Sequence, residues 1–95
     1  MATINEYKLS AMNERDEVFF LALGRRIAGA RKSKGLTQRQ LSEMLGIAQQ
    51  TLAHYEVARL KLSASFLPEL SRILDCTVDE LLGMEEKKEG SLQYK

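Results

Sequence analysis

The stretch that decides the fold runs from Gln38 to Val57 and reads Gln-Arg-Gln-Leu-Ser-Glu-Met-Leu-Gly-Ile-Ala-Gln-Gln-Thr-Leu-Ala-His-Tyr-Glu-Val. Its apolar residues recur at helical spacing on both sides of Gly46. A residue just past a helix end often needs a positive φ, which glycine adopts without a Cβ clash. The stretch therefore predicts two short helices joined by a tight turn, with Ser42 small where they approach. The side chains that we expect in their shared core are Leu41, Leu45, Ile47, Leu52 and Tyr55.

Capping residues set the limits of the first three expected helices. Asn13 is a candidate N-cap for a first helix, which has acidic residues in its first turn and ends near Gly35. Thr37 and Gln40 have the spacing of a capping box, so a second helix starts there and runs to about Leu45. A third follows over about residues 49–57.

Two further helices are expected after a loop. Ser65 is a candidate N-cap for the fourth, because Pro68 is tolerated only in a first turn. A second capping box, Thr77 with Glu80, opens a short helix that closes at Gly83. The buried stripe of the fourth helix is predicted to comprise Phe66, Leu67, Leu70, Ile73 and Leu74. We therefore expect an all-α, five-helix domain over residues 13–83, between a flexible arm at 1–12 and a polar, flexible tail at 84–95.

Composition excludes several classes of protein. At 95 residues with 44% hydrophobic content, the chain suits one small domain. The apolar run at residues 18–24 is too short to span a bilayer, and we expect a cytoplasmic protein. Cys76 is the single cysteine and His54 the single histidine, so we expect no disulfide, metal site or cofactor. The sequence has no Ser-His-Asp set, no paired carboxylates and no phosphate-binding glycine loop. We therefore do not expect an enzyme.

The net charge of +1 conceals an asymmetry along the chain. Residues 22–61 carry eight lysine and arginine residues against two glutamates, whereas residues 75–89 carry six acids against two lysines. Phosphate would attract the first segment and repel the second. This division favours a nucleic-acid ligand for the half that contains the two short helices.

Two helices joined in this way are typical of a helix-turn-helix, whose second helix lies in the DNA major groove and reads bases from its first turns. Those turns carry Gln49, Gln50 and Thr51, and His54 lies one turn beyond Gln50 on the same face. A glutamine amide matches the donor and acceptor of adenine in that groove. The alternative is that both glutamines are plain solvated residues. For His54, a surface histidine and a donor to base or phosphate remain equal alternatives.

Phosphate contacts are expected on both sides of this helix, from Gln38, Arg39, Arg59 and Lys61. The unpaired backbone N–H groups near Gln38, at a helix N-terminus, add an anion site of their own.

Glu56 adjoins Tyr55 on the inner side of the third helix and should have a cationic partner, for which Arg31 is our candidate. The alternative is that each charge is solvated independently.

The chain resembles the lambdoid phage repressor and Cro family, also called the xenobiotic-response-element family, over about residues 23–83. The segments that carry the resemblance are Gly-Leu-Thr-Gln at 35–38, Leu-Gly-Ile-Ala-Gln-Gln at 45–50, Glu56, and Phe-Leu-Pro-Glu-Leu at 66–70. The resemblance implies a five-helix DNA-binding domain. It further implies a phosphate contact for Gln38, base contacts for Gln49, Gln50 and His54, and an internal ion pair of Arg31 with Glu56.

Three positions depart from that family's pattern. Ala48 replaces the usual serine or threonine N-cap of the reading helix. Val57 and Ala58 replace a frequent Asn-Gly, so we expect the helix to continue for another turn. Ser65 lies near the place of a groove-entering arginine in some phage repressors, which leaves a minor-groove contact unassigned.

These features predict a sequence-specific transcriptional regulator, with repression favoured, that binds a palindromic operator as a homodimer. One module buries only roughly 600 to 1,000 Å² on DNA, so tight binding usually needs two half-sites. The C-terminal helix would supply the dimer contact, unless its residues merely seal the core. The apolar residues left for it are Val78, Leu81, Leu82 and Met84. The alternative function is an antitoxin or protein-interaction adaptor with the same fold.

Overall fold

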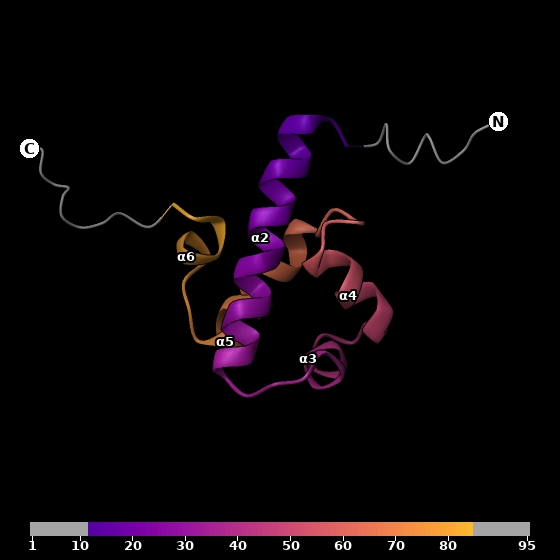
Figure 1. Ribbon diagram of the computed structural model, residues 1–95. Coiled ribbons are helices and arrows are strands. Elements are labelled where there is room, and N and C mark those ends of the chain that lie inside the picture. Colours follow the sequence, from indigo (N-terminus) through magenta and orange to yellow (C-terminus); the bar gives the residue numbers. More distant parts are fainter. Residues whose placement is uncertain (1–11, 85–95) are drawn as a thin grey trace, which may run out of the picture.

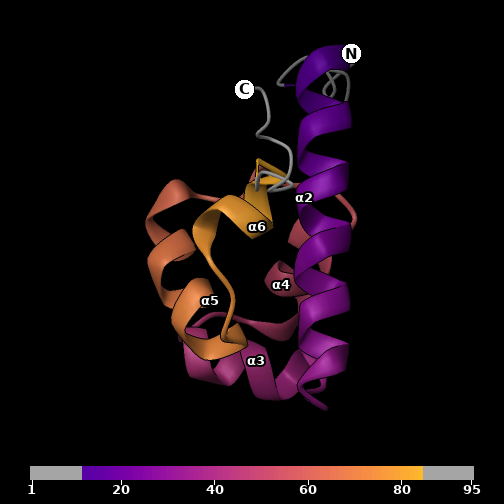
Figure 2. The same cartoon turned by 90° about the vertical axis from the view of Figure 1, so that its left-hand side faces the viewer.

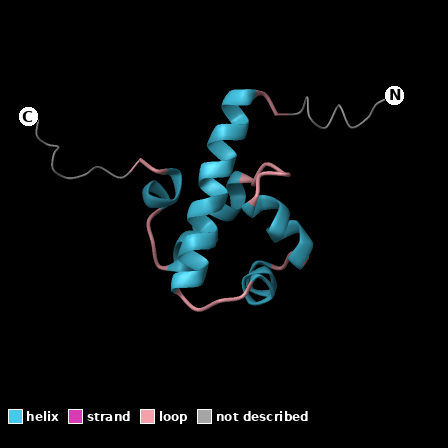
Figure 3. Cartoon of the chain, viewed as in Figure 1, coloured by secondary structure: helices cyan, strands magenta, loops and turns pink. Residues whose placement is uncertain are grey.

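The computed structural model describes residues 12–84, and within them it contains helices and loops but no strand (Figures 1 and 3). The elements are α2 (Glu14–Ser33), α3 (Gln38–Leu45), α4 (Gln49–Glu56), a 3₁₀ turn η1 (Ala64–Phe66), α5 (Leu67–Leu74) and α6 (Val78–Leu82). The predicted all-α, five-helix architecture is therefore confirmed. The expected arm and tail fall almost wholly outside the described residues. No helix within 12–84 combines the length and apolar character needed to cross a membrane.

Helix starts follow the capping residues that the sequence indicates. The side chain of Asn13 accepts a hydrogen bond of 2.8 Å from the backbone N–H of Asp16, which opens α2. At α3, the Gln40 N–H donates to Thr37 Oγ1 at 3.0 Å, and the Thr37 N–H donates to Gln40 Oε1 at 2.9 Å. Thr77 and Glu80 make the same two bonds at α6. Both predicted capping boxes are confirmed, and each satisfies N–H groups that have no partner within the helix.

The core lies along one side of α2, which Figure 2 shows as a long column with the shorter helices packed against it. α2 contacts α4, α5 and α6, while α3 packs on α4. The buried cluster comprises Leu23, Ile27, Leu41, Leu45, Leu52, Leu62, Leu70, Leu74 and Leu81. Ile47, Tyr55 and Phe66 pack against this cluster while keeping part of their surface exposed. Burying a leucine of this kind contributes on the order of 2 kcal/mol, so the cluster accounts for how helices this short hold together.

Two backbone positions fix how closely the helices approach. Gly46 has a φ of 73°, so the turn between α3 and α4 uses the left-handed conformation that the sequence predicts. Gly24, on α2, lies against the end of α4: a Cβ there would be 2.6 Å from the Tyr55 carbonyl oxygen and would also clash with that of Glu56. Only glycine permits this crossing of α2 and α4. The sequence does not predict this close approach, because a glycine inside a helix carries no local sign of its neighbour.

The expected extra turn after the reading helix is wrong, since α4 ends at Glu56. Ala58 adopts a φ of 63°, and the Arg59 N–H then returns to the His54 carbonyl at 2.8 Å. The chain thus makes the left-handed helix ending that a glycine would favour, but with an alanine.

The expected N-cap at Ser65 is also wrong. Ser63 precedes the 3₁₀ turn, and its hydroxyl accepts from the Ser65 N–H at 3.4 Å. α5 follows directly from that turn, and Pro68 lies in its first turn as predicted. Because the 3₁₀ turn Ala64–Phe66 precedes α5, the capping serine is Ser63, two residues before Ser65.

Candidate nucleic-acid interface

The helix-turn-helix is formed by α3 and α4, which meet through their apolar faces. Leu41 and Leu52 are fully buried between them. Ser42 is 2% exposed, and its hydroxyl donates to the Arg39 carbonyl at 2.9 Å instead of requiring a partner outside the helix. This packing fixes the angle at which α4 leaves the turn.

The expected base readers lie together on the first turns of α4. Gln49 and Gln50 are exposed, while Thr51 and His54 are half-buried. Ala48 makes no side-chain capping bond, so backbone N–H groups at the start of α4 lack the acceptor that serine or threonine would provide. The first turn of α4 therefore presents two amide side chains and the positive end of a helix dipole at the surface.

The opposite end of α4 is held by a buried carboxylate, Glu56. Arg31 donates to it twice, from Nε to Oε2 at 2.8 Å and from Nη2 to Oε1 at 3.1 Å. The two side chains are only 9% and 5% exposed, and Arg31 Nη1 also donates to the Leu36 carbonyl at 2.9 Å. A two-pronged pair in which all three guanidinium nitrogens donate is the kind of geometry that makes a buried ion pair tolerable. It ties α4 to α2.

Gln38, expected as a phosphate contact, joins this pair. Its Nε2 donates to Glu56 Oε1 at 2.9 Å, a contact that the sequence analysis did not anticipate. One carboxylate thus connects α2, the start of α3 and the end of α4. An amide nitrogen carries two hydrogens, so the bond to Glu56 orients Gln38 and leaves the amide a second donor.

The other expected phosphate contacts flank α4 on two sides. Arg39 is exposed on α3 and lies 3.3 Å from the Glu43 carboxylate. Arg59 and Lys61 belong to the loop after α4, which Figure 1 places beside the upper half of α2, on the same side as α4. Lys61 Nζ lies 3.4 Å from Asp16 Oδ2, an ion pair that sequence reasoning did not find. The exposed cations thus lie before α4, at Arg39, and after it, at Arg59 and Lys61, and Lys61 is already in an ion pair.

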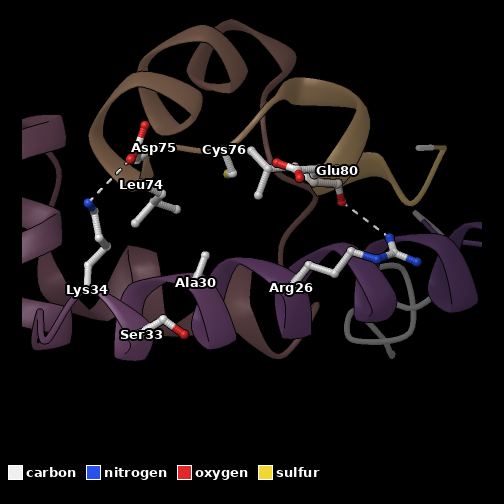
Figure 4. A pocket seen from close by; sticks show the side chains of 9 residues that line it. Arg26, Ala30, Ser33, Lys34, Leu74, Asp75, Cys76 and Glu80 are labelled. Atoms are coloured by element: carbon white, nitrogen blue, oxygen red, sulfur yellow. Dashed lines mark hydrogen bonds and ion pairs between the residues drawn. The ribbon is translucent and has the colours of Figure 1, made fainter. Parts of the chain in front are cut away.

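The acidic part of the described chain lies across α2 from α4 (Figure 1). There an open cleft of about 360 Å³ separates α2 from the α5–α6 connection (Figure 4). Arg26 Nη1 donates to the Leu81 carbonyl at 3.2 Å, and Lys34 Nζ lies 3.8 Å from Asp75, so two bonds bridge this cleft. Burial, helped by the charges of Glu80 and Asp75, raises the pKa of the half-buried Cys76 thiol. This side of the molecule is mixed in charge and does not suit phosphate.

Comparison with known proteins agrees with this geometry. A family model described as helix-turn-helix matches residues 27–81. The HTH-type transcriptional regulator AnsR of Bacillus subtilis is 37% identical over 68 residues, which are 72% of this chain and 59% of that protein. The HTH-type transcriptional regulator ImmR of the same organism is 33% identical over 66 residues, 70% of this chain and 52% of that protein. The chain thus spans little more than half the length of these relatives. Both relatives are named as transcriptional regulators. The match to the family model begins at Ile27, midway along α2.

Proposed function

Because the chain belongs to the helix-turn-helix family of DNA-binding transcriptional regulators, we propose that it recognises a specific operator by inserting the first turns of α4 into the major groove. The observation that carries this proposal is the set of exposed side chains around α4: two amides at its start, and cations on α3 and in the loop after α4. Its proposed location is the cytoplasm, where DNA lies in the bacteria that contain its relatives.

Base recognition is assigned to four side chains of α4. Gln49 and Gln50 are exposed and can each present a donor and an acceptor to one adenine. Thr51 and His54 are half-buried, so only their outer atoms reach the groove. Each good two-bond contact to a base is worth about 1 to 3 kcal/mol of discrimination, which makes the two glutamines the main source of specificity.

Phosphate contacts would fix the register of the protein on the duplex. Gln38 and Arg39 would contact phosphates on one side of α4, and Arg59 and Lys61 would contact phosphates on the other side. The backbone would therefore be bound on both sides of the groove. Such contacts strengthen binding to every sequence alike and make the affinity fall with added salt. The bond from Gln38 to Glu56 supports this role, because it orients the amide at the start of α3.

We further propose a homodimer on a palindromic operator, formed through α6, with repression as the simplest outcome. Leu81 belongs to the core at 2% exposure, and Val78 and Leu82 are half-buried. Met84, at 66% exposure, is the most accessible apolar side chain at this end of the described residues. The contact would therefore centre on Met84 with the outer edges of Val78 and Leu82. A second copy placed there would double the number of bases read.

Selection from a random duplex library, followed by titration at several salt concentrations, tests the proposal. We expect one enriched sequence with two related half-sites about one helical turn apart. Enrichment of a single half-site would refute the palindromic dimer alone. Equal binding to all sequences, or none, would refute operator recognition and favour the antitoxin or adaptor alternative.

A further inference from the structure

The first turns of α2 precede the part of the chain that the family model matches, and they contact the proposed DNA-binding face. Figure 2 shows these turns extending beyond the shorter helices. Asp16 lies on the side of α2 that faces the loop after α4, and its carboxylate is 3.4 Å from Lys61 Nζ. The two residues are 45 positions apart in sequence, so the pair is a product of the fold.

From this contact we propose that Asp16 competes with DNA phosphate for Lys61 and thereby lowers the protein's affinity for DNA. The inference rests on the proposed function, since Lys61 must approach a phosphate in the complex. Asp16 would then be a residue that tunes affinity for all sequences without touching a base.

The position of Asp16 is fixed by the start of α2. Its backbone N–H donates to the Asn13 side chain at 2.8 Å, so it occupies the third position of the helix. Its carboxylate also accepts from Arg15, from Nη2 at 3.2 Å and Nε at 3.3 Å. The Arg15 side chain is 84% exposed, whereas that of Asp16 is only 23% exposed. The carboxylate is thus held towards the protein, where Lys61 reaches it.

The charge of Asp16 is maintained at neutral pH. Desolvation opposes ionisation, but hydrogen bonds from Arg15 and Lys61 outweigh it and lower the pKa of the carboxyl group. An ammonium group has three donors and one unit of charge. A carboxylate beside it repels a phosphate and so offsets much of the attraction between the phosphate and the ammonium group. The Lys61 side chain is 43% exposed, so a phosphate can reach it, but Asp16 already neutralises its charge.

The test measures the affinity of the full chain for duplex DNA with Asp16→Asn, over a range of salt concentrations. Asparagine keeps the size of the side chain and removes its charge. We expect binding about threefold or more tighter at low salt, for selected and random duplexes alike. The plot of log affinity against log salt should be steeper by up to about 0.9, the value for one additional neutralised phosphate.

Glu17→Gln is the matched control, because Glu17 is exposed in the same first turn and the substitution removes the same charge. Comparing the double variant Asp16→Asn with Lys61→Ala to the single variant Lys61→Ala shows whether the effect of Asp16→Asn on affinity depends on Lys61. We expect Asp16→Asn to act no more strongly than the control when Lys61 is absent. Asp16→Ser, also compatible with a first helical turn, replaces Asp16→Asn if that variant does not fold by circular dichroism.

The outcomes separate the two proposals. If wild type binds DNA and Asp16→Asn binds no tighter than Glu17→Gln, or binds more weakly, the competition is refuted while the proposed function stands. An effect that persists without Lys61 also refutes it. If neither wild type nor any variant binds duplex DNA at the lowest salt, the proposed function fails and the inference falls with it.

Discussion

At the scale of single residues, Ala58 is the clearest mismatch between side chain and backbone. Its φ of 63° lies in the left-handed region, where an L-residue other than glycine is strained by about 1 to 2 kcal/mol. Glycine removes that strain but adds entropy to the unfolded chain. We expect Ala58→Gly to raise the free energy of unfolding by about 0.5 to 1 kcal/mol, measured by urea or thermal denaturation.

Ala28→Gly is the control for this prediction. Ala28 lies within α2 with helical geometry, and glycine there should lower stability by up to about 1 kcal/mol. Opposite signs for the two substitutions would locate the effect in the backbone conformation. A loss of stability in Ala58→Gly would contradict the strain assigned to this turn.

Glu56 is the residue on which the relative placement of three helices depends. Glu56→Gln leaves the buried Arg31 charge without its counter-ion, and breaking a buried pair in this way costs about 3 to 5 kcal/mol. Glu43→Gln removes a charge from the exposed pair with Arg39 and should cost at most about 1 kcal/mol. Urea unfolding compares the two. Similar losses in both variants would mean that the buried pair contributes little.

At the scale of elements, α4 starts without a side-chain cap. Ala48 makes no capping bond, although its backbone already has the extended geometry of an N-cap, with φ −69° and ψ 147°. Ala48→Ser should supply the missing acceptor and stabilise the domain by about 0.5 to 2 kcal/mol. The midpoint of thermal unfolding should therefore rise by several degrees. An unchanged or lower midpoint would show that the start of α4 is satisfied by other means.

Helix limits could be predicted from the sequence wherever a local signal sets them. The capping boxes at Thr37 and Thr77 and the glycine at Gly46 act within four residues of themselves, and all three were predicted correctly. The end of α4 could not be predicted, because an alanine at position 58 does not indicate a left-handed backbone conformation. The left-handed conformation at Ala58 accompanies the return of the Arg59 N–H to the His54 carbonyl.

The candidate site shows the same division between local and long-range effects. The side chains of α4 that reach the surface follow from helical periodicity. Gly24 against the end of α4, and Lys61 beside Asp16, depend on contacts between segments far apart in sequence. No pattern within one helix reports either contact. The interaction of Gln38 with Glu56 was missed for the same reason.

At the scale of the whole molecule, the elements with the expected DNA contacts and those with the C-terminal acids lie on different sides of α2. α3, α4 and the loop after α4 lie on one side, whereas Asp75, Asp79 and Glu80 belong to the α5–α6 region. In the proposed complex, the exposed cations around α4 would attract the DNA backbone. Specificity would depend on the few side chains at the start of α4.

The most direct test of the account is base preference in a variant with both Gln49→Ala and Gln50→Ala, measured on the selected operator and on its single-base substitutions. We expect the preference to be lost at the positions facing α4, while weak binding to all duplexes and its salt dependence remain. Arg59→Ala should do the reverse, weakening every duplex alike and keeping the preference. Unchanged base preference in the glutamine variant would contradict recognition of the operator by these two side chains of α4.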